Sequence, residues 1–167
     1  MSRLVRKLTR AVLRRERVSN HSDLSDYTSF YIVYIMAYKK LNLNTNKNFE
    51  IIDITAMINQ EIDIDSGIVN VFSKHSTSAI VVNENETGLL ADLELMLSDL
   101  VSDKYSWQHD NIDNNAKSHL KSFLLSSSET IPITHGKLDL GTWQSVFFIE
   151  LDGPRTNREI NLKFISD

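Results

Sequence analysis

The chain has 167 residues, no cysteine and a formal net charge of −4 at pH 7, and this length suits one domain with a core of its own. Without cysteine it can form neither a disulfide, nor a thiolate metal site, nor a cysteine nucleophile, which fits the reducing cytoplasm, where we expect the protein to act. Any metal that it binds must use histidine, carboxylate or water ligands.

The charge is divided unevenly along the chain. Residues 1–35 contain seven Lys and Arg against three Asp and Glu, whereas residues 36–167 contain eleven against nineteen. Because nucleic acids are bound through clustered Lys and Arg, the acidic body argues against a nucleic-acid partner. The apolar run at 30–36 is too short to span a membrane, so we expect no membrane partner. We predict a basic N-terminal appendage at 1–35, either disordered or not native, and a single α+β domain at 36–167.

The body begins with predicted strands. Segments 49–55 and 68–72 are rich in β-branched residues, and we expect them to be neighbouring strands with a turn at Ser66 and Gly67. A third, short strand is predicted at 79–82, where the apolar run ends at a polar stretch.

Two amphipathic helices follow. Over 87–101 apolar residues recur at three- and four-residue spacing, so we predict a helix that packs on a sheet and is capped by Asn85 or Thr87. A second helix is predicted at 114–125, with Asp113 as its N-cap. Its buried stripe should consist of Ala116, Leu120, Phe123 and Leu124.

The chain then returns to strands, predicted at 130–133, 146–151 and 158–164. In the last of these, Ile160, Leu162 and Phe164 alternate with polar residues, which predicts a strand with one buried and one exposed face. A corner containing Gly141 delivers Trp143 and Gln144 into the 146–151 run, which we expect to be a central, buried strand. Strands, two helices and strands again are typical of an α+β domain with a largely antiparallel sheet.

Three histidines occupy positions that suit a functional site. His75 follows a strand within a stretch of small hydroxyl residues, His109 lies in the loop between the helices beside Asp110, and His119 lies on an apolar helix face. Each alone is more often a surface or core residue, and their spacing matches no diagnostic motif. Together, three imidazoles with nearby carboxylates are what a divalent metal site needs, with Asp110 or Glu84 as orienting group or general base.

The blocks HSTSAIVVNENE, WQHD, NAKSHLKSFLL and GKLDLGTWQSVFFIELDGPR, in this order, resemble the secondary thiamine-phosphate synthase family over residues 48–165. The resemblance implies a β-sandwich of antiparallel strands with two packed helices, assembled as a homotrimer. It implies a zinc-like or magnesium ion on His75, His109 and His119. It also implies a weak transferase activity that joins hydroxymethylpyrimidine diphosphate to thiazole phosphate and releases diphosphate.

The same resemblance places motif positions of the family on further residues. On the hypothesis that the protein is an enzyme, we expect Glu84, Asp110 and Gln144 to be catalytic. We expect Asn83, Thr142, Trp143 and Arg155 to bind the substrate. Two positions depart from the family: Ser126 stands where relatives commonly carry glycine, which leaves the conformation of that loop open, and His135 is either a fourth ligand or a solvated turn residue.

Three functions remain open from the sequence. The first is a metal-dependent enzyme with thiamine-phosphate synthase activity, acting on a small phosphorylated molecule. The second is a non-catalytic trimeric module that binds a metal or a small ligand. The third is a metal-dependent phosphate-ester hydrolase, which would use the same residues with water as the nucleophile.

Overall fold

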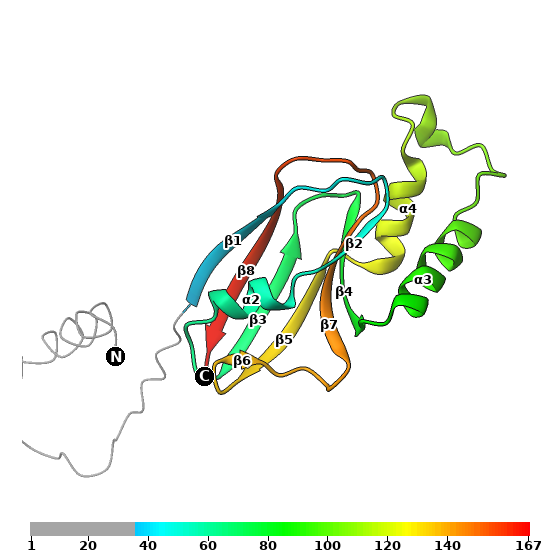
Figure 1. Ribbon diagram of the computed structural model, residues 1–167. Coiled ribbons are helices and arrows are strands. Elements are labelled where there is room, and N and C mark those ends of the chain that lie inside the picture. Colours follow the sequence, from blue (N-terminus) through cyan, green and yellow to red (C-terminus); the bar gives the residue numbers. More distant parts are fainter. Residues whose placement is uncertain (1–35) are drawn as a thin grey trace, which may run out of the picture. The chain divides into compact units, whose positions relative to one another are not determined.

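The computed structural model describes residues 36–167 (Figure 1), and the prediction made for 1–35 lies outside the described residues. The strands are β1 (Met36–Leu43), β2 (Glu50–Asp53), β3 (Gly67–Ser73), β4 (Ser78–Glu84), β5 (Ser128–Thr134), β6 (Lys137–Leu138), β7 (Gln144–Glu150) and β8 (Arg158–Ser166). The helices are α2 (Thr55–Glu61), α3 (Thr87–Leu100) and α4 (Ala116–Leu125), with a short 3-10 helix η1 (Gln108–Asn111).

The strands form two antiparallel sheets. A five-stranded sheet has the order β1-β8-β3-β5-β6, and a three-stranded sheet has the order β2-β7-β4. The main core lies between them, where Val69, Phe148 and Phe164 pack together. A second cluster on the other face of the three-stranded sheet packs Phe147 and Ile149 against residues of α3 and α4, which lie beside β4 in Figure 1. The predicted α+β class, with an antiparallel sandwich and packed helices, is confirmed.

Two strand predictions hold in detail. The 146–151 run was expected to be central, and β7 lies between β2 and β4 with its last five residues buried. In β8 the alternation of the sequence matches its burial: Ile160, Leu162 and Phe164 are fully buried, and the residues between them are partly or largely exposed. A strand with one dry face and one wet face has this period of two.

The early strands differ from the prediction. Segments 49–55 and 68–72 are not neighbours, because β2 belongs to the three-stranded sheet and β3 to the other. The end of the first segment begins α2 instead of continuing a strand. Thr55 starts this helix: its N–H donates to the Asp53 carboxylate at 2.9 Å, and its hydroxyl accepts from the Val146 N–H at 2.8 Å.

The predicted buried stripe of the second helix is wrong at two positions. Phe123 and Leu124 are 85% and 62% exposed, while Ser118 and Ser122 are buried. The serine hydroxyls donate to strand-end carbonyls, Ser118 to Leu151 at 2.6 Å and Ser122 to Ser78 at 2.7 Å. Small side chains with a hydroxyl let α4 approach these backbone oxygens, so the helix turns its bulky face outward.

Helix caps also differ from the expectation. Glu86, not Asn85 or Thr87, caps α3 by accepting from the N–H groups of Gly88 and Leu89, both at 2.7 Å. Asp110, not Asp113, accepts from the first N–H of α4, that of Ala116, at 2.9 Å.

Two further features complete the description of the fold. Ser126, where the resemblance expected glycine, ends α4 with a φ of 72°, so a serine adopts a positive φ that glycine takes more readily. Among residues 36–167, no helix is both long and apolar enough to cross a bilayer.

Candidate functional site

The predicted site residues gather at two ends of the three-stranded sheet. The pairing of β4 with β7 places Glu84 opposite Gln144 at one end and Ser78 opposite Glu150 at the other. Six steps of about 3.4 Å separate these ends by roughly 20 Å. The Gly141–Gln144 corner with Asn83 and Glu84 is therefore far from the Glu150 end, where the predicted ligand His75 and the N-terminus of α4 lie.

At the corner, Gln144 has a structural task. Its Oε1 accepts from the Gly141 N–H at 2.8 Å, and a Cβ on Gly141 would lie 3.2 Å from the same oxygen. Thr142, Glu84 and Asn83 are exposed, and Trp143 keeps 72% of its surface exposed. The corner thus presents an indole and polar groups to solvent, while the Gln144 amide closes the turn.

The histidines of the second helix region form a pair. The rings of His109, on η1, and His119, on α4, meet edge to face with centroids 4.8 Å apart. They line a pocket of about 450 Å³. The other lining residues are Trp107, Gln108, Ala116, Leu120 and Phe123. Since positions 116, 119, 120 and 123 share one helix face, the sequence pattern of α4 builds one wall of this pocket.

Asp110 positions this pair. Its Oδ1 accepts the Ala116 N–H at the start of α4, which ties η1 to the helix that carries His119. A carboxylate at a helix N-terminus is stabilised by the unpaired N–H groups there. One oxygen of Asp110 is therefore committed to holding the two histidine-bearing elements together.

His75 is occupied by another contact. Its Nε2 accepts the Glu159 N–H at 2.9 Å, so this nitrogen carries no proton. Burial lowers the pKa of His75, and the charge of Arg158 lowers it further. Within residues 36–167, no three His, Asp or Glu side chains are grouped so that they could hold a metal. The structure brings together two of the three predicted ligands, His109 and His119.

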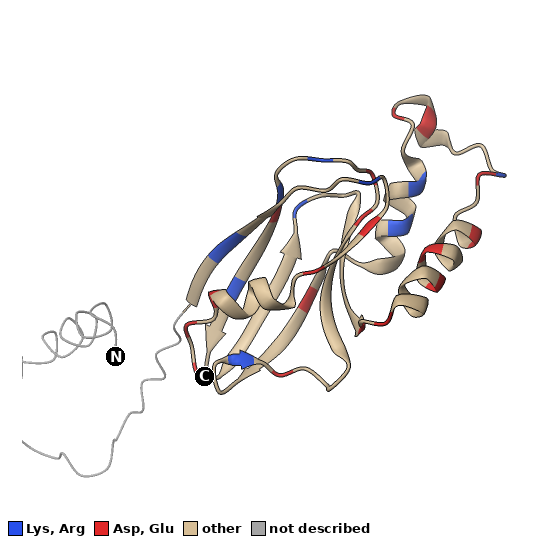
Figure 2. Cartoon of the chain, viewed as in Figure 1, with Lys and Arg blue, Asp and Glu red and all other residues tan. Residues whose placement is uncertain are grey.

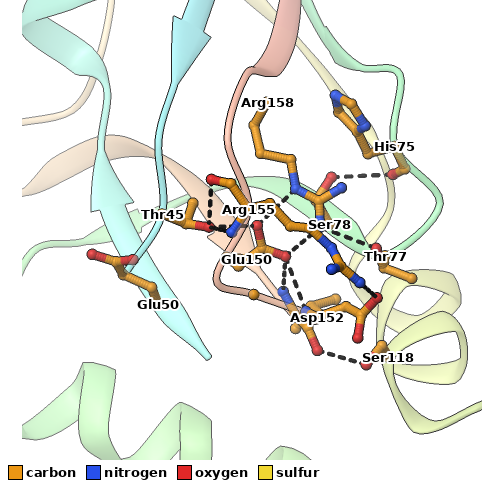
Figure 3. Close-up of polar contacts among 12 residues, drawn as sticks. Thr45, Glu50, His75, Thr77, Ser78, Ser118, Glu150, Asp152, Arg155 and Arg158 are labelled. Atoms are coloured by element: carbon orange, nitrogen blue, oxygen red, sulfur yellow. Dashed lines mark hydrogen bonds and ion pairs between the residues drawn. The ribbon is translucent and has the colours of Figure 1, made fainter. Parts of the chain in front are cut away.

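A buried ion pair was not among the predicted site residues (Figure 3). Glu150 is fully buried, and Arg158 donates to both of its oxygens, at 2.7 Å from Nε and 2.5 Å from Nη2. The same carboxylate accepts from the Thr45 hydroxyl and from the N–H groups of Leu151 and Asp152. Burial by itself raises the pKa of Glu150, but the hydrogen bonds and the charge of Arg158 outweigh it and hold the pKa below its usual range.

This network is saturated, which indicates a structural role. Arg158 also donates to the Thr77 hydroxyl at 3.1 Å, so the pair links the loops before β2, before β4 and after β7. The sequence signal for it was a carboxylate at the end of an otherwise apolar strand, because such a group needs a partner when buried.

Arg155 lies beside this network but remains accessible. Its guanidinium pairs with Asp152 at 2.7 Å, and about half of its side chain is exposed. Asp152 also accepts from the Asn115 amide at 3.2 Å, so Arg155 is tied to the residue that precedes α4. Of the predicted substrate residues, Arg155 is the one that lies near the histidine-bearing helix.

Comparison with known proteins places the chain in a family. A family model described as "UPF0047 protein YjbQ-like" matches residues 39–167. The chain belongs to the YjbQ/UPF0047 family. A UPF0047 protein of Methanothermobacter thermautotrophicus is 52% identical over 130 residues, which cover 75% of this chain and 91% of that protein. The UPF0047 protein YugU of Bacillus subtilis is 35% identical over 124 residues, covering 71% and 92%.

A solved structure supports the same assignment. It is described as a YbjQ-like protein of unknown function from Sulfolobus solfataricus, is 36% identical, and superimposes with a TM-score of 0.76. The match covers 81% of this chain and all of that one. The family predicted from the sequence is therefore wrong: the family model and these relatives point to YjbQ/UPF0047, and nothing in them points to thiamine-phosphate synthase or to a transferase.

Proposed function

We propose that this protein is a self-assembling module that binds a divalent metal and a small ligand at the His109–His119 pocket. The observation that carries the proposal is the pair itself: two imidazoles in contact, 4.8 Å between ring centres, at the wall of a pocket of about 450 Å³. Pockets of this volume that combine apolar lining with a few polar groups are typical of small-molecule sites.

The donor set fits a metal in part. Imidazole nitrogens suit zinc-like ions better than magnesium, which prefers oxygen. Two histidines leave coordination positions open, and these would be filled by water, by the ligand or by a residue of another copy. When bound, such an ion would polarise an oxygen of the ligand. The protein's own contribution is Asp110, which holds η1 against α4 and so keeps the two rings together.

Self-assembly is supported by the outward faces of α3 and α4. Leu95, Leu100 and Leu124 are each more than 60% exposed, and on α3 only Leu97 is buried. Soluble monomers rarely expose large contiguous apolar patches. Phe123 is both exposed and part of the pocket lining, so the pocket opens at this surface. We propose that this assembly is the homotrimer that the resemblance implied, and that the protein acts in the cytoplasm.

Hydrolysis of a phosphate ester is a second candidate, favoured by Arg155. Its half-exposed guanidinium is held through Asp152 to Asn115 at the start of α4, where it would neutralise a phosphate. The same helix also carries Lys117 and Lys121, and Figure 2 shows basic residues along it. A ligand that carries a phosphate would also agree with the small phosphorylated partner expected from the sequence.

The test is metal content. We expect purified wild-type protein that has been offered Zn²⁺ to keep close to one ion per chain, and His109→Ala and His119→Ala to lose it. His135→Asn is the matched control, because it removes an imidazole from an exposed turn with a φ of 52°, which asparagine tolerates. Elemental analysis after gel filtration, with the oligomeric state recorded, measures this. Wild-type protein without metal, or equal content in His119→Ala, refutes the metal site.

Two additions sharpen the test. His75→Ala shows whether the third predicted ligand takes part: loss of metal there means that the site is completed beyond the pair. The metal-loaded protein is also assayed with p-nitrophenyl phosphate, beside Arg155→Met. Hydrolysis that depends on His119 and Arg155 supports the second candidate, and metal binding without hydrolysis supports the binding module.

A further inference from the structure

Two buried polar atoms have no partner among residues 36–167: Nε1 of Trp107, a donor, and Oδ1 of Asn115, an acceptor. Trp107 lines the pocket, and Asn115 immediately precedes Ala116, which lines it too. Buried polar groups are almost always satisfied, so an unpaired indole N–H marks a place where an acceptor belongs. The part of the chain that the structure describes contains other buried polar side chains, and those are paired.

The other residues that line the pocket indicate which kind of ligand would carry this acceptor. Ala116, Leu120 and Phe123 are apolar, and Trp107 adds an aromatic surface. The polar members are Gln108, His109 and His119, which can all donate hydrogen bonds. No Asp or Glu is among the lining residues, so the described pocket has no carboxylate to pair with an organic cation. Aromatic rings stack favourably on such a surface.

We infer that the pocket binds a small aromatic anion, with its ring against the apolar lining and its oxyanion, a carboxylate or a phosphate, accepting the Trp107 indole N–H. The inference rests on the proposed function because it concerns the same pocket, and it names the ligand class. The anion would also lie within the reach of donors from the histidine pair. Because Nε1 is buried, the pocket wall must adjust as the ligand enters.

The chain offers a direct readout of this contact. It has two tryptophans, so its ¹H–¹⁵N spectrum contains two indole N–H signals, and Trp143 lies at the far end of the three-stranded sheet as an internal control. Trp107→Phe assigns the signals and removes the N–H while keeping an aromatic ring. The probes are benzoate and phenyl phosphate, and benzylammonium is the control ligand, since it keeps the ring but has no acceptor oxygen.

We expect benzoate or phenyl phosphate, whichever oxyanion the pocket takes, to shift the Trp107 signal saturably and to leave that of Trp143 unchanged. Trp107→Phe should weaken that binding about tenfold, as loss of a hydrogen bond to a charged group does. The titrations are made with zinc-loaded protein and again with a chelator.

Three results overturn the inference: neither anion shifts the Trp107 signal, benzylammonium binds as well as the anions, or Trp107→Phe binds them with unchanged affinity. Failure of the proposed metal site has a different signature. If the protein retains no zinc but an anion still shifts the Trp107 signal in the presence of chelator, the aromatic-anion site stands and the metal does not.

Discussion

Replacing Arg158 by methionine should destabilise this protein severely, because it removes the partner of a fully buried carboxylate. Arg158 is 6% exposed and holds both oxygens of Glu150. Methionine fills much of the volume of the arginine side chain but does not neutralise the charge of the Glu150 carboxylate. Removing one member of a buried pair typically costs about 3–5 kcal/mol. At roughly 2–4 °C per kcal/mol for a domain of this size, the melting temperature should fall by about 6–20 °C.

The structure supplies two comparisons for this variant. Arg155→Met breaks a similar ion pair, with Asp152, but at an Arg side chain that is 51% exposed, so its melting temperature should change by no more than about 3 °C. Adding Glu150→Gln to Arg158→Met removes the unpaired charge and should recover part of the loss. Thermal melts by circular dichroism at one protein concentration would measure all four proteins.

The pH dependence of this variant has a definite sign. In the wild type the pKa of Glu150 lies below its ordinary value of 4.5, so its contribution to stability is present above that pH and is lost as the pH falls through the folded-state pKa. Without Arg158, burial is the largest influence and the pKa should rise above the ordinary value. The difference in melting temperature between wild type and Arg158→Met should therefore become smaller from pH 7 to pH 4.

An equal change in melting temperature for Arg158→Met and Arg155→Met would refute this reasoning, because it would mean that burial of the pair contributes nothing. A difference in melting temperature that grows as the pH falls would refute the predicted direction of the pH dependence.

Two other predictions concern assembly and His75. Wild-type protein should elute from gel filtration with a light-scattering mass of about 57 kDa, three times 19.1 kDa. Leu124→Glu should elute as a monomer, whereas Glu94→Gln, a polar change on α3, should keep the mass of the trimer. A monomeric wild type would exclude the trimer. Burial and the charge of Arg158 depress the pKa of His75 below 6.5, so the contribution of His75 to stability is present above that pH and is lost below it. The wild-type melting temperature should therefore fall between pH 7.5 and 5.5 relative to that of His75→Gln, which keeps a hydrogen-bond acceptor. Parallel curves of melting temperature against pH for the two proteins would contradict this.

The strands of this fold could be predicted where side chains follow a simple period. In β8 alternation alone identified the buried residues, and in β7 the unbroken apolar run indicated a strand covered on both faces. The sheet to which each strand belongs could not be predicted, because pairing depends on partners far along the chain. β2, for example, pairs with β7, about a hundred residues later.

The site was predictable in part for a similar reason. His109 and His119 are ten residues apart and connected by a cap at Ala116, so local chemistry brings them together. His75 lies in another part of the fold, where its Nε2 accepts a hydrogen bond from the Glu159 N–H. No sequence pattern near His75 predicts that contact. Nothing in the sequence pattern marked Trp107 as a site residue, because an unpaired N–H becomes visible only in three dimensions.

Ser118 and Ser122, which bind α4 to the sheet, are constrained for a different reason than the residues of α4 that line the pocket. Positions 118 and 122 meet backbone carbonyls of the same chain, so any larger side chain there would push the helix off the sheet. Positions 119 and 123, one residue or about 100° around the helix, face the pocket instead. Among homologues, the first pair should therefore stay small whatever the protein does, and under the proposed function the second should change only when the ligand changes. A change of ligand could thus evolve on this helix without any cost to folding.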